Sequence, residues 1–246
     1  MNAIDTPKSA AAIAAILFDK DGTLIGYDAS WGPVNRELAA IAAQGDAALA
    51  DRLLLACGMD PVTGHVKADS LLAAGNTAEI AAGLIAAGSS CDERELTVRL
   101  DRLFTEAAGK SVAVTDLKAF FARLKGRGFK LGIASSDNEA SIRELAKRFG
   151  FDADLDFVAG YDSGHGTKPQ PGMVLGFCRA IGLTPERVAV VGDNNHDLHM
   201  GRNAGAGLRV AVLTGTGSKD SLAADSDYCF DDITGLENLL PDRATV

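Results

Sequence analysis

A short acidic segment directly after an apolar run is the feature that most constrains how this chain folds. Residues 13–18 have the character of a buried strand, and the sequence DKDGTL, beginning at Asp19, follows them at once. In an extended chain, residues two apart point the same way, so Asp19 and Asp21 can face one small volume with Lys20 turned aside. Gly22 then permits a tight bend. Two carboxylates this close require a cation between them or a proton on one of them, which indicates a chemical site.

The segment 27–110 shows helical patterns and little that predicts strand. Pro33 is suited to a first helical turn, and Asp46 is suited to cap a second helix. Asn76 begins a capping-box sequence, and Asp92 is placed to cap a last helix. Apolar residues follow each start at helical spacing. We therefore expect a helical domain formed by residues 27–110, inserted directly after the acidic segment.

Beyond residue 110 the pattern alternates between helix and strand. Apolar strands are expected at residues 130–134, 157–159, 188–191 and 208–213, with a last strand near Tyr228. Strands that alternate with helices predict right-handed βαβ units and a parallel sheet covered by helices on both faces. The predicted fold is α/β, a doubly wound parallel sheet formed by residues 1–26 and 111–246, with the smaller helical domain as a second unit.

The polar clusters of the chain follow the predicted strands. Ser135 and Ser136 follow the strand 130–134, Lys168 lies in the loop after 157–159, and Asp193, Asn194 and Asp197 follow 188–191. Ligands of such sheets bind beyond the carboxyl ends of the strands. Hydroxyls and free backbone amides at a helix start also suit an oxyanion. The sequence therefore predicts a single site at this edge of the sheet.

In this order, the clusters resemble the four motifs of the haloacid dehalogenase superfamily of phosphohydrolases. DKDGTL resembles the first motif, DxDGT, and Ser135 stands at the Ser/Thr of the second. Lys168 stands at the lysine of the third, and Asp193 with Asp197 forms the GDxxxD of the fourth. The helical insertion lies where this family places one type of cap domain. Within the family, the chain looks most like the phosphoglycolate-phosphatase group.

The resemblance implies a Mg²⁺-dependent phosphatase acting on a small phosphorylated metabolite. Asp19 would be the nucleophile that forms an aspartyl phosphate, and Asp21 the general acid and then the base. The residues implied to hold the phosphoryl group are Ser135, Ser136, Lys168, Gly22 and Thr23. Mg²⁺ is expected on Asp19, on the backbone carbonyl of Asp21 and on Asp193. Asp197 and Asn194 are expected to support this site.

The charges of these groups agree with that scheme. The four aspartates at positions 19, 21, 193 and 197 are opposed by the charges of Mg²⁺ and Lys168. A proton on Asp21 brings the empty site to neutrality, and that is the state a general acid needs.

Charge and cysteine content limit which binding partners and which cellular compartment are expected for this chain. The net charge of −9 argues against nucleic-acid binding, so an anionic substrate must be attracted by local positive charge. The four cysteines show no CxxC spacing, which favours reduced thiols in a cytoplasmic protein. The apolar run 10–18 lacks a basic leader and is interpreted as a buried strand. No stretch approaches the roughly 20 apolar residues that span a bilayer. Oligomeric state is not predicted.

Other interpretations remain beside this one. A phosphomutase would use the same residues, and a non-catalytic phosphate-binding module would keep the fold without turnover. An EF-hand is excluded because its glycine and closing glutamate are missing at the required positions. A surface position for Lys168 is a minor alternative. For Trp31 we favour packing over recognition. The histidines have no assigned role: a loop position is favoured for His165, and a solvated helix face for His196 and His199.

Overall fold

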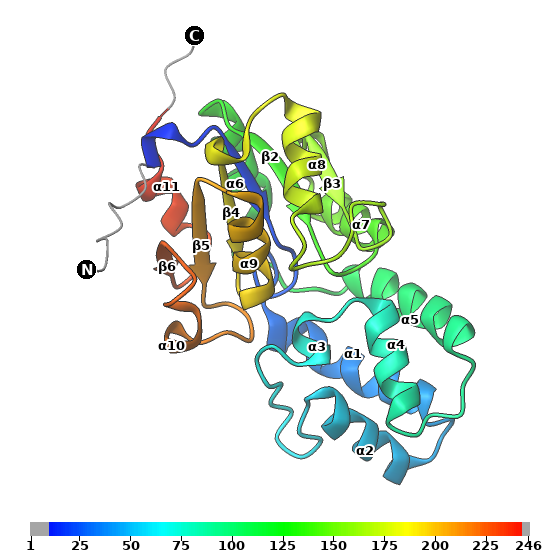
Figure 1. Cartoon of the computed structure of the whole chain (residues 1–246). Helices are drawn as coiled ribbons and strands as arrows, with labels where there is room; N and C mark the ends of the chain where they lie inside the picture. Colours follow the sequence, from blue (N-terminus) through cyan, green and yellow to red (C-terminus); the bar gives the residue numbers. More distant parts are fainter. Residues whose placement is uncertain (1–9, 243–246) are drawn as a thin grey trace.

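The computed structural model describes residues 10–242, and its centre is a parallel sheet of six strands (Figure 1). The spatial order is β3-β2-β1-β4-β5-β6. The strands are β1 (Ala15–Phe18), β2 (Lys130–Ala134), β3 (Phe157–Ala159), β4 (Val188–Gly192), β5 (Leu208–Val212) and β6 (Tyr228–Phe230). The chain runs outward from β1 to β3 and then crosses to β4, so the switch point of the topology lies between β1 and β4. The predicted doubly wound sheet is confirmed.

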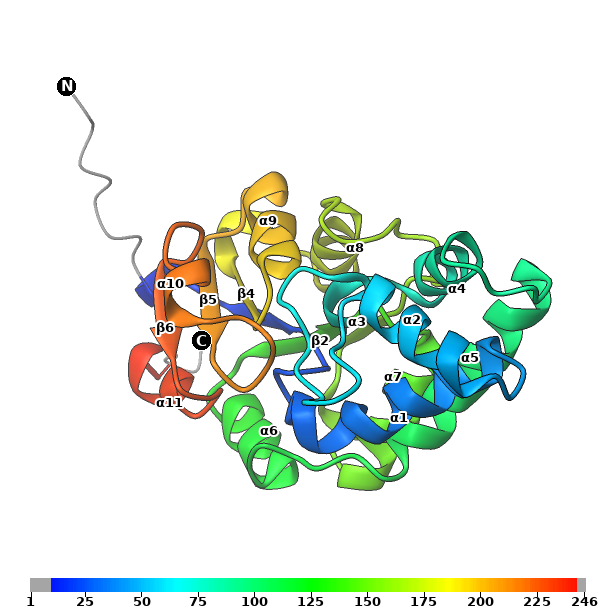
Figure 2. The same ribbon diagram turned by 90° about the horizontal axis from the view of Figure 1, so that it is seen from below.

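Alternation along β1 divides the core between the two faces of the sheet. Ile16 and Phe18 pack with residues of α6 and α7, whereas Ala15 and Leu17 pack with residues of α8 and α9. The helices concerned are α6 (Leu117–Gly126), α7 (Glu139–Phe149), α8 (Gly172–Ile181), α9 (Asn195–Ala204) and α11 (Gly235–Leu239). Figure 2 shows α8 and α9 on one side of the strands and α6 and α11 on the other. Since both faces are covered, the central strand β1 is apolar and buried along its whole length.

Five helices between β1 and α6 form a separate group, which we call the helical segment. They are α1 (Tyr27–Ala42), α2 (Ala47–Cys57), α3 (Leu71–Ala74), α4 (Thr77–Ala86) and α5 (Glu93–Ala108). These helices bury an apolar core of their own, and Figure 1 shows them gathered at one end of the sheet. The domain boundaries given above stay a prediction.

The predicted caps of these helices are present. Asp46 accepts a hydrogen bond from the Leu49 amide at 3.0 Å. Asn76 and Glu79 form the reciprocal capping box, with distances of 3.0 and 2.9 Å. Asp92 accepts from the amide of the third residue of α5 at 2.9 Å. Each cap satisfies a backbone donor that the helix leaves unpaired.

Two expectations about local structure are wrong. Pro33 does not lie in the first turn of a helix, because α1 already begins at Tyr27 and contains the proline. The proline lacks the N–H that would bond to the carbonyl of Ala29, but Ala29 is exposed, so water can satisfy that carbonyl. Burial of Tyr27 and Trp31, four residues apart on one helix face, outweighs the cost of the proline. Residues 10–12, at the start of the expected strand, form a 3₁₀ helix instead.

The remaining elements are a short helix, α10 (Lys219–Leu222), and two further 3₁₀ turns at Asp152–Asp154 and Pro185–Arg187. All four cysteines are unpaired; Cys57 and Cys178 are buried and the other two partly exposed. Among the described residues, no helix combines the length and apolar character needed to cross a membrane.

Replacing Phe121 by alanine is expected to destabilise the protein by about 3–5 kcal/mol, because it removes a buried ring from the centre of one sheet face. The ring of Phe121 is fully buried and stacks on Phe151, with a centroid distance of 4.3 Å. The free energy of unfolding in urea measures the effect. Val62→Ala is the control, because Val62 is 90% exposed and its truncation leaves the unfolding midpoint unchanged. A Phe121→Ala midpoint equal to that of the control would contradict this description of the core.

Candidate active site

The first strand ends in a tight turn that carries Asp19 and Asp21. The amide of Asp19 donates to the carbonyl of Val191 at 2.8 Å, which ties the turn to β4. Gly22 has a φ of +80°, a conformation that residues with a Cβ rarely adopt. A Cβ at Gly22 would also lie 2.6 Å from the carboxylate of Asp193. Glycine is therefore required here by the backbone and by the close approach of Asp193.

Lys168 is buried between two carboxylates. Its Nζ donates to Oδ1 of Asp19 and to Oδ1 of Asp197, each at 2.5 Å. Burial lowers the pKa of Lys168, but the charges of the two carboxylates outweigh burial and raise this pKa above its ordinary value. Lys168 is thus an ammonium group in the interior, 7% exposed, and the alternative of a surface lysine is wrong.

Asp193 adds a third carboxylate to what we call the Lys168 cluster: Lys168, Asp19, Asp193 and Asp197. The three aspartates offer oxygen atoms that all lie within 4.8 Å of one another. Burial raises the pKa of Asp193 well above its ordinary value, and the charges of Asp19 and Asp197 raise it further. Burial likewise raises the pKa of Asp197, to about 7. The cluster holds more negative charge than one ammonium group offsets.

The residues of this cluster fit a magnesium ion. Mg²⁺ takes oxygen ligands and is usually held by one or two carboxylates together with water. Asp19 and Asp193 stand at the carboxyl ends of the adjacent strands β1 and β4 and present such oxygens in a buried, negatively charged place. Asp197 is engaged with Lys168, which agrees with its expected supporting position. Metal binding by the Asp21 carbonyl stays a prediction.

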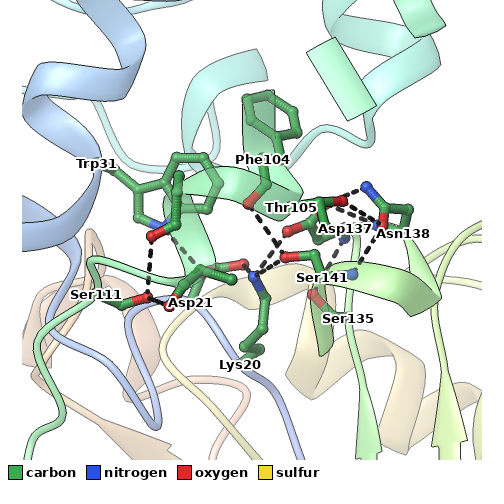
Figure 3. A network of polar contacts seen from close by, with 12 residues as sticks. Lys20, Asp21, Trp31, Phe104, Thr105, Ser111, Ser135, Asp137, Asn138 and Ser141 are labelled. Carbon is green, nitrogen blue, oxygen red and sulfur yellow. Dashed lines mark hydrogen bonds and ion pairs between the residues drawn. The ribbon is translucent and has the colours of Figure 1, made fainter. Parts of the chain in front are cut away.

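A second buried ion-pair cluster, which we call the Lys20 cluster, is formed by Lys20, Asp21 and Asp137 (Figure 3). Lys20 Nζ donates to Asp137 Oδ2 at 2.7 Å and to Ser141 Oγ at 3.1 Å, and lies 3.1 Å from Asp21 Oδ2. Trp31, on α1, donates from Nε1 to Asp21 Oδ1 at 2.8 Å. Both oxygens of Asp21 therefore contact a donor, one from its own turn and one from the helical segment. Burial raises the pKa of Asp21 to about 6, against the lowering effect of Lys20.

The sequence pattern does not reveal this second cluster. Lys20 is turned away from the cavity described below, as alternation predicts, yet its ammonium group reaches back to Asp21. Its partner Asp137 is 117 residues away in the chain. A lysine between a buried strand and a buried turn does indicate that an acidic partner lies nearby, because a buried ammonium group needs one. It does not indicate which residue that partner is. Trp31 packs on Phe104, as expected, but also bonds to Asp21.

The two serines after β2 differ in what they contact. Ser135 is 1% exposed, and its Oγ accepts a hydrogen bond from the backbone amide of Asp137 at 3.1 Å. Ser136 donates from Oγ to the carbonyl of Ala74 at 3.1 Å, which joins this loop to the end of α3. Both serines line the cavity, and their binding of a phosphoryl group stays a prediction.

Asn194 caps α9 and keeps a donor free. Its Oδ1 accepts the amide of His196 at 3.0 Å, which fixes the orientation of the side-chain amide. Its own backbone amide donates to Asp197 Oδ2 at 3.2 Å, completing a capping box. Asn194 Nδ2 is buried and has no hydrogen-bond partner among the residues that the structure describes. A buried donor that lines the cavity is suited to an acceptor oxygen of a ligand.

A cavity of about 60 Å³ lies between the carboxyl ends of the strands and the helical segment. The residues that line it from the strand ends are Asp19, Asp21, Ser135, Ser136, Asp137, Lys168, Asp193, Asn194, His196 and Asp197. The residues from the helical segment are Tyr27, Trp31, Asn35, Leu72, Ala73, Ala74, Gly75, Thr77, Ile80 and Phe104. Gly22 and Thr23 are buried and are not part of this lining, and their contact with a phosphoryl group stays a prediction.

The histidines differ partly from expectation. The solvated face predicted for His196 is wrong: this residue lines the cavity, and burial lowers the pKa of its imidazole. His199 is partly buried, with Nε2 2.7 Å from Asp225 Oδ2. The ring of His165 packs against Phe157 at 5.4 Å between centroids, as a loop residue.

Comparison with known proteins identifies a family for this arrangement. The model of the haloacid dehalogenase-like hydrolases matches residues 13–205. A pyrophosphatase PpaX from Halalkalibacterium halodurans is 29% identical over 121 residues, which are 49% of this chain and 56% of the relative. A phosphoglycolate phosphatase from Psychrobacter arcticus is 27% identical over 134 residues, which are 53% of this chain and 57% of the relative. The chain thus spans about half the length of the curated relatives it matches.

A solved structure shows the same fold over nearly the whole length. The crystal structure of a predicted phosphoglycolate phosphatase from Haemophilus somnus aligns with a TM-score of 0.66, over 93% of this chain and 98% of that chain. The sequence identity is 20%. The likeness therefore concerns the fold, the parallel sheet with its helices, and not the substrate.

Replacing Lys20 by methionine is expected to destabilise the protein by about 3 kcal/mol, because it leaves the buried Asp137 carboxylate without its cation. The free energy of unfolding in urea measures the loss. The double variant Lys20→Met/Asp137→Asn should recover part of it, since the uncompensated charge is then removed as well. Arg102→Met is the matched control, because its pair with Glu106 is exposed at the surface. If Lys20→Met unfolds at the same urea concentration as this control, the ion pair does not stabilise the fold.

Proposed function

The chain belongs to the haloacid dehalogenase-like hydrolases, and from that premise we propose that it is a Mg²⁺-dependent phosphatase. Its substrate is a small phosphate monoester, and the reaction proceeds through an aspartyl phosphate on Asp19. The observation that carries the proposal is the Lys168 cluster. A nucleophilic carboxylate, an ammonium group and further metal-type carboxylates meet there at the switch point of a parallel sheet.

In the first step, a carboxylate oxygen of Asp19 attacks phosphorus, and the bond between phosphorus and the alcohol oxygen breaks. Asp21 gives its proton to the departing alkoxide, so a neutral alcohol leaves. Lys168 and Ser135 hold the phosphoryl oxygens through ammonium and hydroxyl donors. The position of Lys168 supports its role, because its Nζ already donates a hydrogen bond to Asp19.

In the second step, Asp21 takes a proton from water, and the water oxygen attacks the phosphorus of the aspartyl phosphate. The bond from phosphorus to Asp19 breaks, inorganic phosphate is released and Asp19 returns to a carboxylate. Mg²⁺ bound by Asp19 and Asp193 would offset the negative charge of the phosphoryl group as it meets the Asp19 carboxylate. The helical segment covers the site and limits the access of other water.

The names of the relatives suggest the first compounds to assay. Phosphoglycolate and pyrophosphate are the substrates implied by the two curated relatives described above. Because the chain spans only part of those relatives, the narrower substrate is a matter for experiment. The groups that react with the phosphoryl group in this proposal all come from the strand ends.

Hydrolysis of p-nitrophenyl phosphate tests the function directly. The purified protein should release p-nitrophenol with Mg²⁺, lose this activity on chelation and regain it when Mg²⁺ is restored. Asp19→Asn should reduce turnover at least about 10,000-fold, because an amide cannot act as the nucleophile. Asp51→Asn is the control, an exposed residue of α2 that should keep full activity. Turnover in Asp19→Asn equal to that of Asp51→Asn would exclude Asp19 as the nucleophile.

Asp21→Asn separates the two steps. The p-nitrophenolate group departs without needing a proton, so the variant should still transfer the phosphoryl group to Asp19. Hydrolysis of the intermediate should be about 100- to 10,000-fold slower, because no base activates the water. Intact-protein mass spectrometry after mixing with substrate should therefore detect an added phosphoryl group in this variant and none in Asp19→Asn/Asp21→Asn. Normal steady-state turnover in Asp21→Asn would show that Asp21 is not the acid and base.

A further inference from the structure

The two halves of the cavity differ in charge. The strand-end half contains five carboxylates and one ammonium group, Lys168. The half formed by the helical segment contains aromatic, aliphatic and uncharged polar side chains: Tyr27, Trp31, Asn35, Leu72, Thr77, Ile80 and Phe104, with small residues between them. In Figure 3, Trp31 and Phe104 lie on the side of the helices, opposite Ser135. A phosphoryl group held at Asp19 and Lys168 would therefore have its alcohol portion against uncharged groups.

Among the described residues that line the cavity, none offers a free cation for a second anionic group of the substrate. The basic side chains of this lining are Lys168 and His196. Lys168 is occupied by Asp19 and Asp197 and would also serve the phosphoryl group. His196 is only partly exposed, and its buried Nδ1 has no hydrogen-bond partner among the described residues, so a charge on this ring would be poorly compensated. Lys20 lies outside the lining and is paired with Asp137 and Asp21.

The acidic groups add repulsion to this lack of attraction. Asp137 lines the cavity between the phosphoryl site and the helical segment, and its two oxygens are occupied by Lys20 and by Asn138. Asp21 shares the Lys20 ammonium group with Asp137, at 3.1 and 2.7 Å. A carboxylate or second phosphate on the substrate would enter this space without a cation to pair with, because the nearby ammonium group is already taken up by these carboxylates. The net charge of −9 on the chain opposes it further.

We propose that the substrate is a phosphate monoester whose alcohol portion is uncharged and largely apolar, and that the site discriminates against monoesters with a second anionic group. This inference rests on the proposed phosphatase function and narrows it. Asn35 on α1, one turn after Trp31, supplies an uncharged amide on the same helix face for a hydroxyl of such an alcohol. Phosphoglycolate, pyrophosphate and sugar bisphosphates then fall outside the preferred class.

A matched pair of substrates tests the inference. 2-Hydroxyethyl phosphate and phosphoglycolate share a two-carbon skeleton and differ in whether the far carbon carries a hydroxyl or a carboxylate. With Mg²⁺ saturating, kcat/KM should be about 100-fold higher for 2-hydroxyethyl phosphate, because the carboxylate is buried unpaired and beside like charge. A ratio below about 10 overturns the inference, since one weak polar contact can account for a preference of that size.

The failure of this inference is distinguishable from the failure of the proposed function. Release of p-nitrophenol that depends on Mg²⁺ and on Asp19, combined with equal or better hydrolysis of phosphoglycolate, overturns the substrate class and leaves the phosphatase. Absence of hydrolysis for all three esters overturns both. Conversion of a sugar monophosphate to its isomer in the presence of the sugar bisphosphate would also overturn the substrate class, because the site would then accept two phosphates.

A gain-of-function variant supplies the missing cation. Asn35→Arg places a guanidinium group on the helical side of the cavity, and it should raise kcat/KM for phosphoglycolate relative to 2-hydroxyethyl phosphate by about tenfold. Ala40→Arg is the control; it adds the same charge at an exposed position of α1 outside the cavity lining and should leave the ratio unchanged. An unchanged ratio in a folded Asn35→Arg would count against the charge argument. The comparison of the two esters on the unmodified protein decides the inference even if the arginine variant does not fold.

Discussion

The contact of the Lys168 ammonium group with Asp19 and Asp197 is the interaction on which the site depends. Strand β1 ends just before Asp19 and β4 just before Asp193, and their pairing brings buried carboxylates together at the switch point. Without a cation, this arrangement would be opposed by like-charge repulsion and by the cost of burying charge. Lys168 comes from a third loop, so the cluster also fixes where the chain between β3 and α8 must lie.

The Lys20 cluster changes the description of the site but not its balance of charge. It adds one carboxylate, Asp137, and one ammonium group, Lys20, which pair with each other at 2.7 Å. Mg²⁺, Lys168 and a proton on Asp21 would therefore still neutralise the four aspartates at positions 19, 21, 193 and 197. The second cluster orients the Asp21 side chain. Lys20 contacts one carboxylate oxygen of Asp21 and Trp31 the other. In the proposed mechanism, this orientation would determine which atom Asp21 can protonate.

The sequence is sufficient to predict the sheet and the strand-end residues, because both follow from local rules. Short apolar runs predict the strands, and the polar residues directly after them place Asp19, Ser135 and Asp193 at one edge. The Lys20–Asp137 pair depends instead on two segments that meet only in the fold, and no local pattern names the partner. Pro33 also shows that a local rule can be overridden by the fold. Its local preference for a helix start is overridden by burial of the aromatic residues that precede it in α1.

The helical segment contacts the proposed catalytic groups as well as covering them. Trp31 bonds to Asp21, Ser136 bonds to the carbonyl of Ala74, and Asn195 bonds to Asp69 at 3.2 Å, so three strand-end loops contact the segment through hydrogen bonds. A movement of the segment that breaks the Trp31 contact would also release one oxygen of the proposed acid. In the proposed mechanism, access of substrate and orientation of Asp21 would therefore be coupled through the same residues. Because the uncharged lining proposed for the alcohol lies on this segment too, selection of substrate and proton transfer would both depend on the position of the helices relative to the sheet.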